Sequence, residues 1–323
     1  MRTFRDLPGA TALALAAVLT APVAVVALPA TAVARSAEVA PATNLQAEAF
    51  VDEVTLTWQD PAVPGLATVV RGKPGKVPPS SPTDGFALTV GSGSTTATAY
   101  GLESDTPYSF AVFARDLAGE YAAPATITVS SLTVSISAPA KVVRPNYATI
   151  SGKVTDAITG APVGFTPVHL FAVPTTTEDL IPIGTANTHP DGRYSFQLVP
   201  PEHALFVALA VGDAQHLSGG AVSSLMKVVA SVALRTLNRM QPLGAYFSFQ
   251  AKVDPVSTKV PVVLQQRVGK TWKTVQKAKP NRRGVVNFKI KPTKRGKVVF
   301  RAKRGAVPGA AAGTSKNATI TVR

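Results

Sequence analysis

Two stretches of this chain repeat each other at a spacing of 92 to 94 residues. The motif PVHL starts at Pro167 and PVVL starts at Pro261, while DGRYSF ends at Phe196 and RGVVNF ends at Phe288. An internal repeat of this length indicates two equivalent domains rather than a single large one. At 323 residues, the chain also has room for another domain before the repeats.

The pattern inside these segments predicts short β-strands. Glycine (24 residues) and proline (27 residues) are plentiful, and few stretches show the 3.6-residue apolar period of a helix. In VTLTW, the side chains of Val54, Leu56 and Trp58 alternate with two threonines, as in a strand with one buried face. Asp191-Gly192 is suited to a hairpin turn between two strands. The sequence therefore predicts an all-β protein.

The first folded segment resembles a fibronectin type III domain over about 90 residues. The similarity is carried by VTLTW and a following proline, by GLESDTPYSFAVFARDLAG, and by YAAPATITV. It implies that Trp58 packs in the core and that the hydroxyl of Tyr108 bonds nearby backbone at a corner, so both residues are structural. One departure is the stretch 71–85, whose proline and glycine content predicts a long irregular loop.

The second and third segments resemble the immunoglobulin-like repeats of exported proteins from high-GC Gram-positive bacteria. GKTWKTV, from Gly269, matches a hairpin motif of those repeats, and DGRYSF matches a turn motif. The second segment lacks the tryptophan, and the third has RGVVNF in place of the acidic turn. The resemblances imply tandem β-sandwiches: a fibronectin type III-like domain at 40–131, an Ig-like domain at 132–228 and a basic Ig-like domain at 229–323.

The N-terminus predicts an export signal peptide over residues 1–34. Two arginines precede an apolar run from about Ala10 to Leu28, and small residues at 32–34 suit signal peptidase. The apolar run is also long enough to span a bilayer, so an uncleaved membrane anchor is the alternative. Because small exported animal domains usually carry disulfides and this chain has no cysteine, we expect a secreted bacterial protein, free or associated with the cell surface.

No arrangement of residues predicts catalysis. The four histidines, none with the close spacing of a helical metal site, are His169, His189, His203 and His216. Hydrolysis needs two carboxyl groups opposed across a cleft, whereas adjacent residues such as Asp52 and Glu53 point to opposite faces of a strand. The same holds for the acids at Glu103, Asp105 and Glu178-Asp179, which we interpret as solubilising loop residues. We predict a protein that is not an enzyme, with no cofactor and no metal.

Positive charge is concentrated at the C-terminal end. The formal net charge is +15, and from Val228 onward the only acid is Asp254. Alternation places Lys289 and Lys291 on the outer face of one strand, and we expect the next strand to be its neighbour in the same sheet. Together with turn residues, among them Arg304, this predicts a wide polyanion-binding surface, whose members are Lys289, Lys291, Lys297, Arg301, Lys303, Arg282, Arg283, Lys294 and Arg295.

Such a surface attracts polyanions with an affinity that falls as salt rises. For an exported bacterial protein, the expected partners are anionic cell-wall polymers or acidic polysaccharide, and specific nucleic-acid recognition is not expected. A surface that only keeps the domain soluble is the alternative. The other two domains are expected to act as spacers or as contacts for protein partners.

Trp272, between two lysines near a hairpin tip, gives a second functional hypothesis. An exposed indole there could stack on a sugar ring, as in a carbohydrate-binding accessory protein of a polysaccharide-degrading system. The competing interpretation is that the ring covers the outer face of its hairpin. With only 2 Trp and 6 Tyr, the chain has few aromatic residues for a broad glycan platform.

Overall fold

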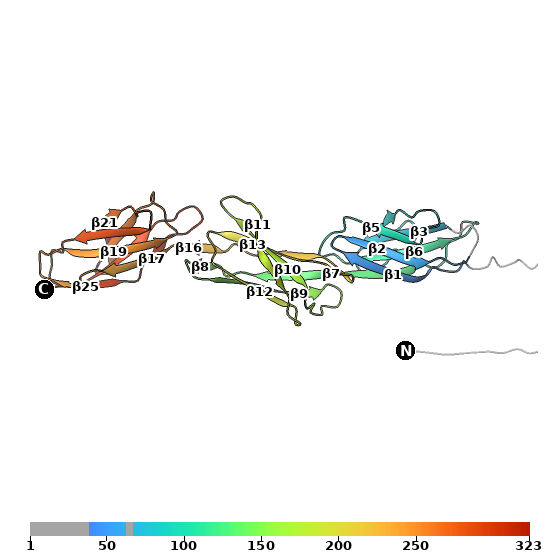
Figure 1. The fold of residues 1–323 in the computed structure, drawn as a ribbon, viewed down its shortest axis with the longest axis horizontal. Helices are drawn as coiled ribbons and strands as arrows, with labels where there is room; N and C mark the ends of the chain where they lie inside the picture. Colours follow the sequence, from blue (N-terminus) through green and yellow to red (C-terminus); the bar gives the residue numbers. More distant parts are fainter. Residues whose placement is uncertain (1–38, 63–66) are drawn as a thin grey trace, which may run out of the picture. The chain divides into compact units, whose positions relative to one another are not determined.

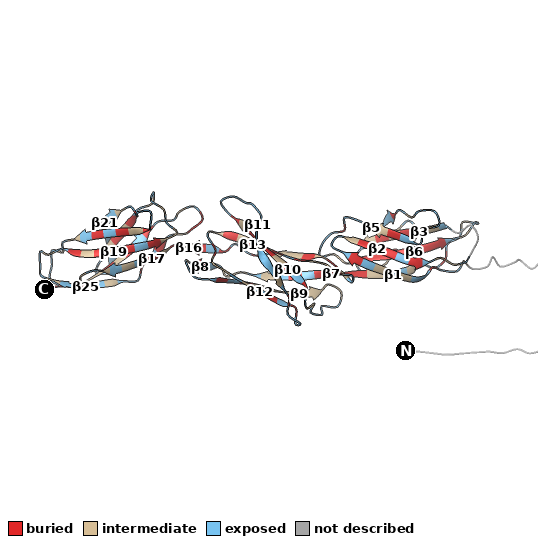
Figure 2. Ribbon diagram, viewed as in Figure 1, coloured by how far each residue is buried: buried red, intermediate tan, exposed pale blue. Residues whose placement is uncertain are grey.

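The computed structural model describes residues 39–62 and 67–323, so the predicted signal peptide at 1–34 lies outside the described residues. The described residues form 25 β-strands and no α-helix, which confirms the all-β prediction. Within these ranges, no helix is long and apolar enough to cross a membrane. Buried and exposed residues alternate along many strands, as expected for sheets with one face in a core (Figure 2).

The first domain is a sandwich of two antiparallel layers (Figure 1). One sheet has the order β1-β2-β5, formed by β1 (Thr43–Phe50), β2 (Glu53–Gln59) and β5 (Thr96–Ala99). The other has the order β4-β3-β6-β7, formed by β3 (Ala67–Pro74), β4 (Phe86–Leu88), β6 (Tyr108–Arg115) and β7 (Ala125–Ser137). Val54, Leu56 and Trp58 are buried together between the layers, as their alternation predicts.

Trp58 and Tyr108 both serve the packing of this domain. Trp58 is 4% exposed, and its indole N–H donates to Oδ1 of Asp60 at 2.8 Å. Tyr108 is 6% exposed, and its hydroxyl accepts a hydrogen bond of 3.2 Å from the backbone N–H of Glu103. A tyrosine that bonds backbone a few residues upstream is the corner expected for this kind of sandwich.

The irregular loop is shorter than the sequence predicts. Strand β3 includes Arg71 and continues to Pro74, which pairs with Tyr108. Pro74 is the last residue of the strand and lies beyond Gly72, where the pairing with β4 ends. The remaining connection, 75–85, is held by an ion pair of 2.7 Å between Lys73 and Asp84. Proline therefore ends the strand here instead of excluding it.

The second domain is also a sandwich. One sheet has the order β12-β9-β7, with β9 (Ala148–Asp156) and β12 (Arg193–Leu198). The other has the order β11-β10-β13-β15, with β10 (Pro167–Pro174), β11 (Ile181–Asn187), β13 (Ala204–Ala210) and β15 (Gly219–Val222). Two further strands, β8 (Lys141–Val143) and β16 (Lys227–Val229), pair in parallel. The two-residue strand β14 (His216–Leu217) pairs with β7.

The third domain repeats this plan. Its smaller sheet has the order β17-β19-β22, with β17 (Ser231–Thr236), β19 (Phe247–Asp254) and β22 (Val285–Ile290). Its larger sheet has the order β18-β25-β23-β20-β21. These strands are β18 (Met240–Gln241), β20 (Val262–Val268), β21 (Thr271–Ala278), β23 (Gly296–Arg304) and β25 (Ala318–Val322). The two-residue strand β24 (Gly313–Thr314) also pairs with β23. The β-bulge after Leu170 recurs after Leu264, which supports the repeat found in the sequence.

Neighbouring domains interlock across the predicted boundaries. Strand β7 contains the boundary at residues 131 and 132, so one strand serves two sandwiches. Leu217 comes from the second predicted domain but is fully buried in the core of the first. Ala310 comes from the third predicted domain and is buried in the core of the second. Each repeat therefore inserts the corresponding loop into the domain before it.

Two glycines make these insertions possible. A Cβ atom on Gly219 would collide with the carbonyl oxygen of Leu132, and a Cβ atom on Gly313 would collide with that of Ala230. The two glycines occupy equivalent places in the repeats, at the first residues of β15 and β24. A side chain at either glycine would push the inserted loop away from the backbone of Leu132 or of Ala230.

Candidate functional site

The two strands that were predicted to be neighbours in one cationic sheet belong to different sheets. Strand β22 pairs with β19 at the edge of the smaller sheet, whereas β23 lies between β20 and β25 in the larger one. The expectation that Lys289 and Lys291 share one sheet face with Arg301 and Lys303 is therefore wrong. Alternation determines which side chains face inward, but it does not determine which sheet a strand joins.

Lys289 of β22 and the lysines just after this strand instead border a groove at the edge of the sandwich. Strand β22 lies against β21, the edge strand of the larger sheet, and the backbone N–H of Lys289 donates to Oε1 of Gln276 at 3.2 Å. A groove of about 660 Å³ opens here. Three lysines line it, Lys289, Lys291 and Lys294, together with the apolar residues Val268, Val275 and Val298.

Tyr246 orders two of these lysines. The Nζ atom of Lys289 lies 4.5 Å from the centre of the Tyr246 ring, and that of Lys291 lies 5.9 Å from it. An ammonium group within about 6 Å of an aromatic face is attracted by the ring. Because part of their side-chain freedom is already restricted, the two lysines lose less entropy when an anion binds.

The outer face of the larger sheet forms a separate cationic area. Lys297 and Lys303 are exposed there, and Arg301 is partly buried between two side chains. The Cζ atom of Arg301 lies 4.2 Å from the centre of the Trp272 ring, and its Nε donates to Oε1 of Gln265 at 2.8 Å. One face of the indole is thus already occupied, which favours the interpretation that Trp272 covers its hairpin.

The same sheet face differs in chemistry between the two repeats. Gln265 pairs with Arg301 in the third domain, and the corresponding pair in the second domain is Phe171 with Val207. An apolar pair has therefore been replaced by a polar and a cationic residue at the same positions. The charge difference between the two domains lies on surface positions, so it does not disturb the shared core pattern.

The arginines of the hairpin turn lie near a second hollow. Oδ1 of Asn281 accepts hydrogen bonds from the backbone N–H groups of Arg283 at 3.0 Å and Val285 at 2.9 Å, which shapes the turn. Arg282 is exposed at this turn. Arg283 lines a hollow of about 500 Å³ together with Arg235 and Lys252. The last members of the predicted set, Lys294 and Arg295, are exposed in the connection from β22 to β23.

Arg304 does not lie at an exposed turn as predicted. It is fully buried at the end of β23, and its Nε, Nη1 and Nη2 atoms have no hydrogen-bond partner among the described residues. Burial lowers the pKa of its guanidinium group, an effect that the negative charge of Asp254 partly opposes. Arg304 is therefore a structural residue, and it is not part of the surface.

Among the described residues, the surface cations have no acidic partner. Asp254, the only acid after Val228, forms an ion pair of 3.1 Å with Arg144 of the second domain. Across residues 39–62 and 67–323, none of the nine predicted cations forms an ion pair with a carboxylate. The third domain therefore presents a positive field to solvent that is compensated only by mobile counterions.

The histidines lie apart from one another in the second domain. Nδ1 of His169 lies 2.8 Å from the hydroxyl of Thr185, and His189 is exposed. Nδ1 of His203 accepts a hydrogen bond of 2.7 Å from the backbone N–H of Val228. His216 lies between two aspartates at the boundary with the first domain. Among the described residues, no group of three or more potential ligands is arranged to hold a metal ion.

Two residues that contact the groove lysines were not identified from the sequence. Tyr246 lies just before β19, where the alternation of Phe247 and Phe249 inward places it outward, so the pattern contained a usable signal. Gln276 reaches β22 from the other sheet. Its role depends on how the two sheets stack, which no local pattern contains.

The chain matches no known protein family and no curated protein. Solved structures with some similarity include the FN1–FN3 domains of chicken CNTN1, at 13% identity and a TM-score of 0.24, covering 88% of this chain and 98% of that one. A tetra-tandem repeat from the extending region of a large adhesion protein has 14% identity and a TM-score of 0.31, covering 86% and 73%. The D0-D1 domain of Intimin has 15% identity and a TM-score of 0.24, covering 59% and 99%. The evidence for function therefore comes from the residues of this chain.

Proposed function

We propose that this chain is an exported, non-catalytic modular protein of a bacterial surface, whose third domain binds anionic polymers of the cell envelope. The first two domains act as spacers or as contacts for protein partners. The observation that carries the proposal is the groove lined by Lys289, Lys291 and Lys294, in a domain whose single acid is already paired with Arg144. Cell-wall phosphate polymers and acidic polysaccharides are the expected ligands.

The physical basis is electrostatic attraction that several lysines exert together. Exposed ion pairs are individually weak, contributing about 0 to 1 kcal/mol each, so useful affinity requires a polymer that engages many cations at once. The groove at the sandwich edge can bind one part of such a polymer, and the separate cations on the outer face of the larger sheet can bind another. Because these charges are exposed, binding should weaken as added salt screens them.

The groove can be tested by reversing its charge in the full chain. We expect the triple variant Lys289→Glu, Lys291→Glu and Lys294→Glu to lose most of its binding to purified bacterial cell walls. The matched control reverses three exposed lysines that do not line the groove, Lys259, Lys279 and Lys316, with the same change in net charge. The control should lose much less binding.

The outcomes separate the groove from charge in general. Equal losses in the two triple variants would show that the charge acts diffusely and that the groove is not the site. Unchanged binding in both would contradict electrostatic attraction altogether. If the chain instead bound a neutral polysaccharide in high salt and lost that binding on Trp272→Ala, the carbohydrate-binding alternative would replace the proposal.

A further inference from the structure

The boundary between the first and second domains is formed by one loop, residues 213–220, which we call the junction loop. Besides burying Leu217 in the first core, the loop exchanges backbone hydrogen bonds with the first domain. The N–H of Ala49 donates to the carbonyl of Ala214 at 3.1 Å, and the N–H of Ser218 donates to that of Val51 at 2.9 Å. The N–H of Asp105 donates to the carbonyl of Ser218 at 3.1 Å.

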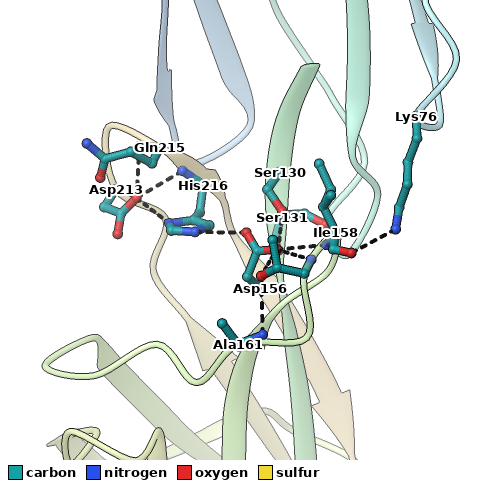
Figure 3. Close-up of polar contacts among 10 residues, drawn as sticks. Lys76, Ser130, Ser131, Asp156, Ile158, Ala161, Asp213, Gln215 and His216 are labelled. Atoms are coloured by element: carbon teal, nitrogen blue, oxygen red, sulfur yellow. Dashed lines mark hydrogen bonds and ion pairs between the residues drawn. The ribbon is translucent and has the colours of Figure 1, made fainter. Parts of the chain in front are cut away.

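His216 lies at the centre of the junction loop, between two carboxylates (Figure 3). Its Nε2 atom is 3.1 Å from Oδ2 of Asp156, and its Nδ1 atom is 2.7 Å from Oδ1 of Asp213. The side chains of His216 and Asp156 are 17% and 12% exposed. Since the backbone of His216 also pairs with Ser130 of β7, the loop is tied to the strand shared by both domains.

Each nitrogen of the imidazole ring faces a carboxylate oxygen. A neutral imidazole carries one N–H group, and its other nitrogen is an acceptor with a lone pair. Carboxylates only accept hydrogen bonds, so a neutral His216 satisfies one aspartate and turns a lone pair toward the other. An imidazolium donates to both and balances their charge. Histidine ordinarily changes its charge between pH 5 and 8.

The two aspartates are held in place independently of the His216 ring. Oδ1 of Asp156 accepts hydrogen bonds from the backbone N–H groups of Ile158 at 2.9 Å and Thr159 at 2.6 Å. Asp213 accepts from the backbone N–H groups of Gln215 and His216, both at 2.9 Å. Both carboxylates therefore keep their positions when the ring loses its proton, so the mismatch cannot be relieved by turning one of them away.

Other charged groups at the junction do not contact the His216 ring. Asp105, from the first domain, accepts the backbone N–H of Gly220 with both carboxylate oxygens at 3.1 Å. Burial raises the pKa of this carboxyl group, and the hydrogen bond from Gly220 opposes the effect. Lys76 donates to the carbonyl of Ile158 at 3.1 Å (Figure 3). The partners that contact the imidazole ring are the two aspartates.

The boundary between the second and third domains is built with a different cation. There Asp254 pairs with Arg144, whose charge does not change over the physiological pH range. Arg144 also donates to the carbonyls of Pro200 and Pro201, each at 3.1 Å. The chain thus pairs the acid with a histidine at one boundary and with an arginine at the other.

From the placement of His216 between Asp156 and Asp213, we propose that the junction loop is a pH-sensitive clasp. Protonated His216 closes it in mildly acidic medium. In neutral to alkaline medium the deprotonated ring repels one aspartate, and the contacts of the junction loop with the first domain open more often. The boundary that contains Arg144 does not open in this way.

Hydrogen exchange of the full chain at pH 5.5 and 8.0 tests the clasp. After correction for the intrinsic pH dependence of amide exchange, we expect the amides of Ala49, Asp105 and Ser218 to lose protection by roughly fivefold at pH 8.0. A local probe is needed because a second histidine, His203, accepts a hydrogen bond through Nδ1 from the backbone N–H of Val228 at the other boundary.

Two variants keep the result interpretable. His216→Gln removes the titratable ring, and Asp213→Asn removes one charge while keeping an oxygen that can accept the loop amides. Both should lose most of the pH dependence at the three amides, whereas His189→Gln, at an exposed histidine, should retain it. The proposal is overturned if the wild-type amides show equal or greater protection at pH 8.0, or if both variants keep the wild-type difference.

Discussion

Asp156 and Asp254 occupy the same place in the two repeats. Each is the last residue of the central strand of the smaller sheet, and each forms an ion pair at the boundary with the preceding domain. The partner of Asp156 is His216 and that of Asp254 is Arg144. The repeat therefore preserves the acid at each boundary while the cation differs.

Asp156 should make the protein sensitive to strong acid. Burial by itself raises the pKa of this carboxyl group, but hydrogen bonds from Thr159, Ser130 and Ile158 outweigh it and lower the pKa to about 2. Because the folded pKa lies below the unfolded value, the contribution is present above pH 4 and lost as the pH falls through 2. We expect a loss of about 2 kcal/mol of stability over this range.

Urea unfolding at pH 4.5 and 2.5 measures this loss. In Asp156→Asn, the part of the acid sensitivity that comes from this group should be missing, so the two midpoints should lie closer together than in the wild type. Identical pH dependence of stability in the two proteins would show that folding does not lower the pKa of Asp156.

Replacing Arg304 should stabilise the third domain. Its guanidinium is fully buried without a hydrogen-bond partner among the described residues, and such a group carries a desolvation cost that its attraction to Asp254 only partly offsets. We expect Arg304→Met to raise the unfolding free energy by about 1 to 3 kcal/mol. Lys303→Met, the same charge change at an exposed neighbour, should have an effect within about 0.5 kcal/mol. A destabilised Arg304→Met protein would mean that the guanidinium has a partner that stabilises it.

The hydroxyl of Tyr108 should contribute about 1 kcal/mol. Tyr108→Phe removes the acceptor of the Glu103 N–H while leaving the buried ring in place, so the loss isolates one hydrogen bond. Thermal unfolding followed by circular dichroism measures the change, with Tyr100→Phe as the control because Tyr100 is 73% exposed. Equal melting temperatures for the two variants would argue against a corner that contributes to stability.

The two boundary glycines should tolerate no side chain. We expect Gly219→Ala and Gly313→Ala to destabilise the protein by about 1 to 3 kcal/mol each, since the added methyl group meets the carbonyl oxygen of Leu132 or of Ala230. Gly184→Ala is the matched control because a Cβ there meets nothing within 4 Å. Hydrogen exchange should place the loss at the boundary next to each substituted glycine. Stable variants with unchanged boundary protection would show that the loops are not held tightly.

Local patterns in the sequence were sufficient for the class of fold and for several structural residues. The alternation of Val54, Leu56 and Trp58 predicted a buried strand face, and the structure has it. Offsets between short motifs predicted two equivalent domains, and in the structure a β-bulge recurs after Leu170 and Leu264. Such features depend on side-chain period and turn chemistry, which are properties of neighbouring residues.

Features that depend on how distant segments meet were not predictable. The sequence does not show that β22 and β23 join different sheets, that Arg304 faces inward, or that Leu217 belongs to the core of the domain before its own. The arrangement around His216 was missed for the same reason, since Asp156 is 60 residues away from it in the chain. Sandwich topology brings these groups together, and a periodic pattern carries no information on topology.

The most direct test of the proposed function is binding of the full chain to purified cell walls at low and high salt, before and after removal of the wall phosphate polymers. We predict strong binding at low salt that is lost on raising the salt and is also lost when the polymers are removed. Binding that persists under both treatments, or no binding at low salt, would contradict the proposal that the third domain holds the protein at the cell envelope through its cations.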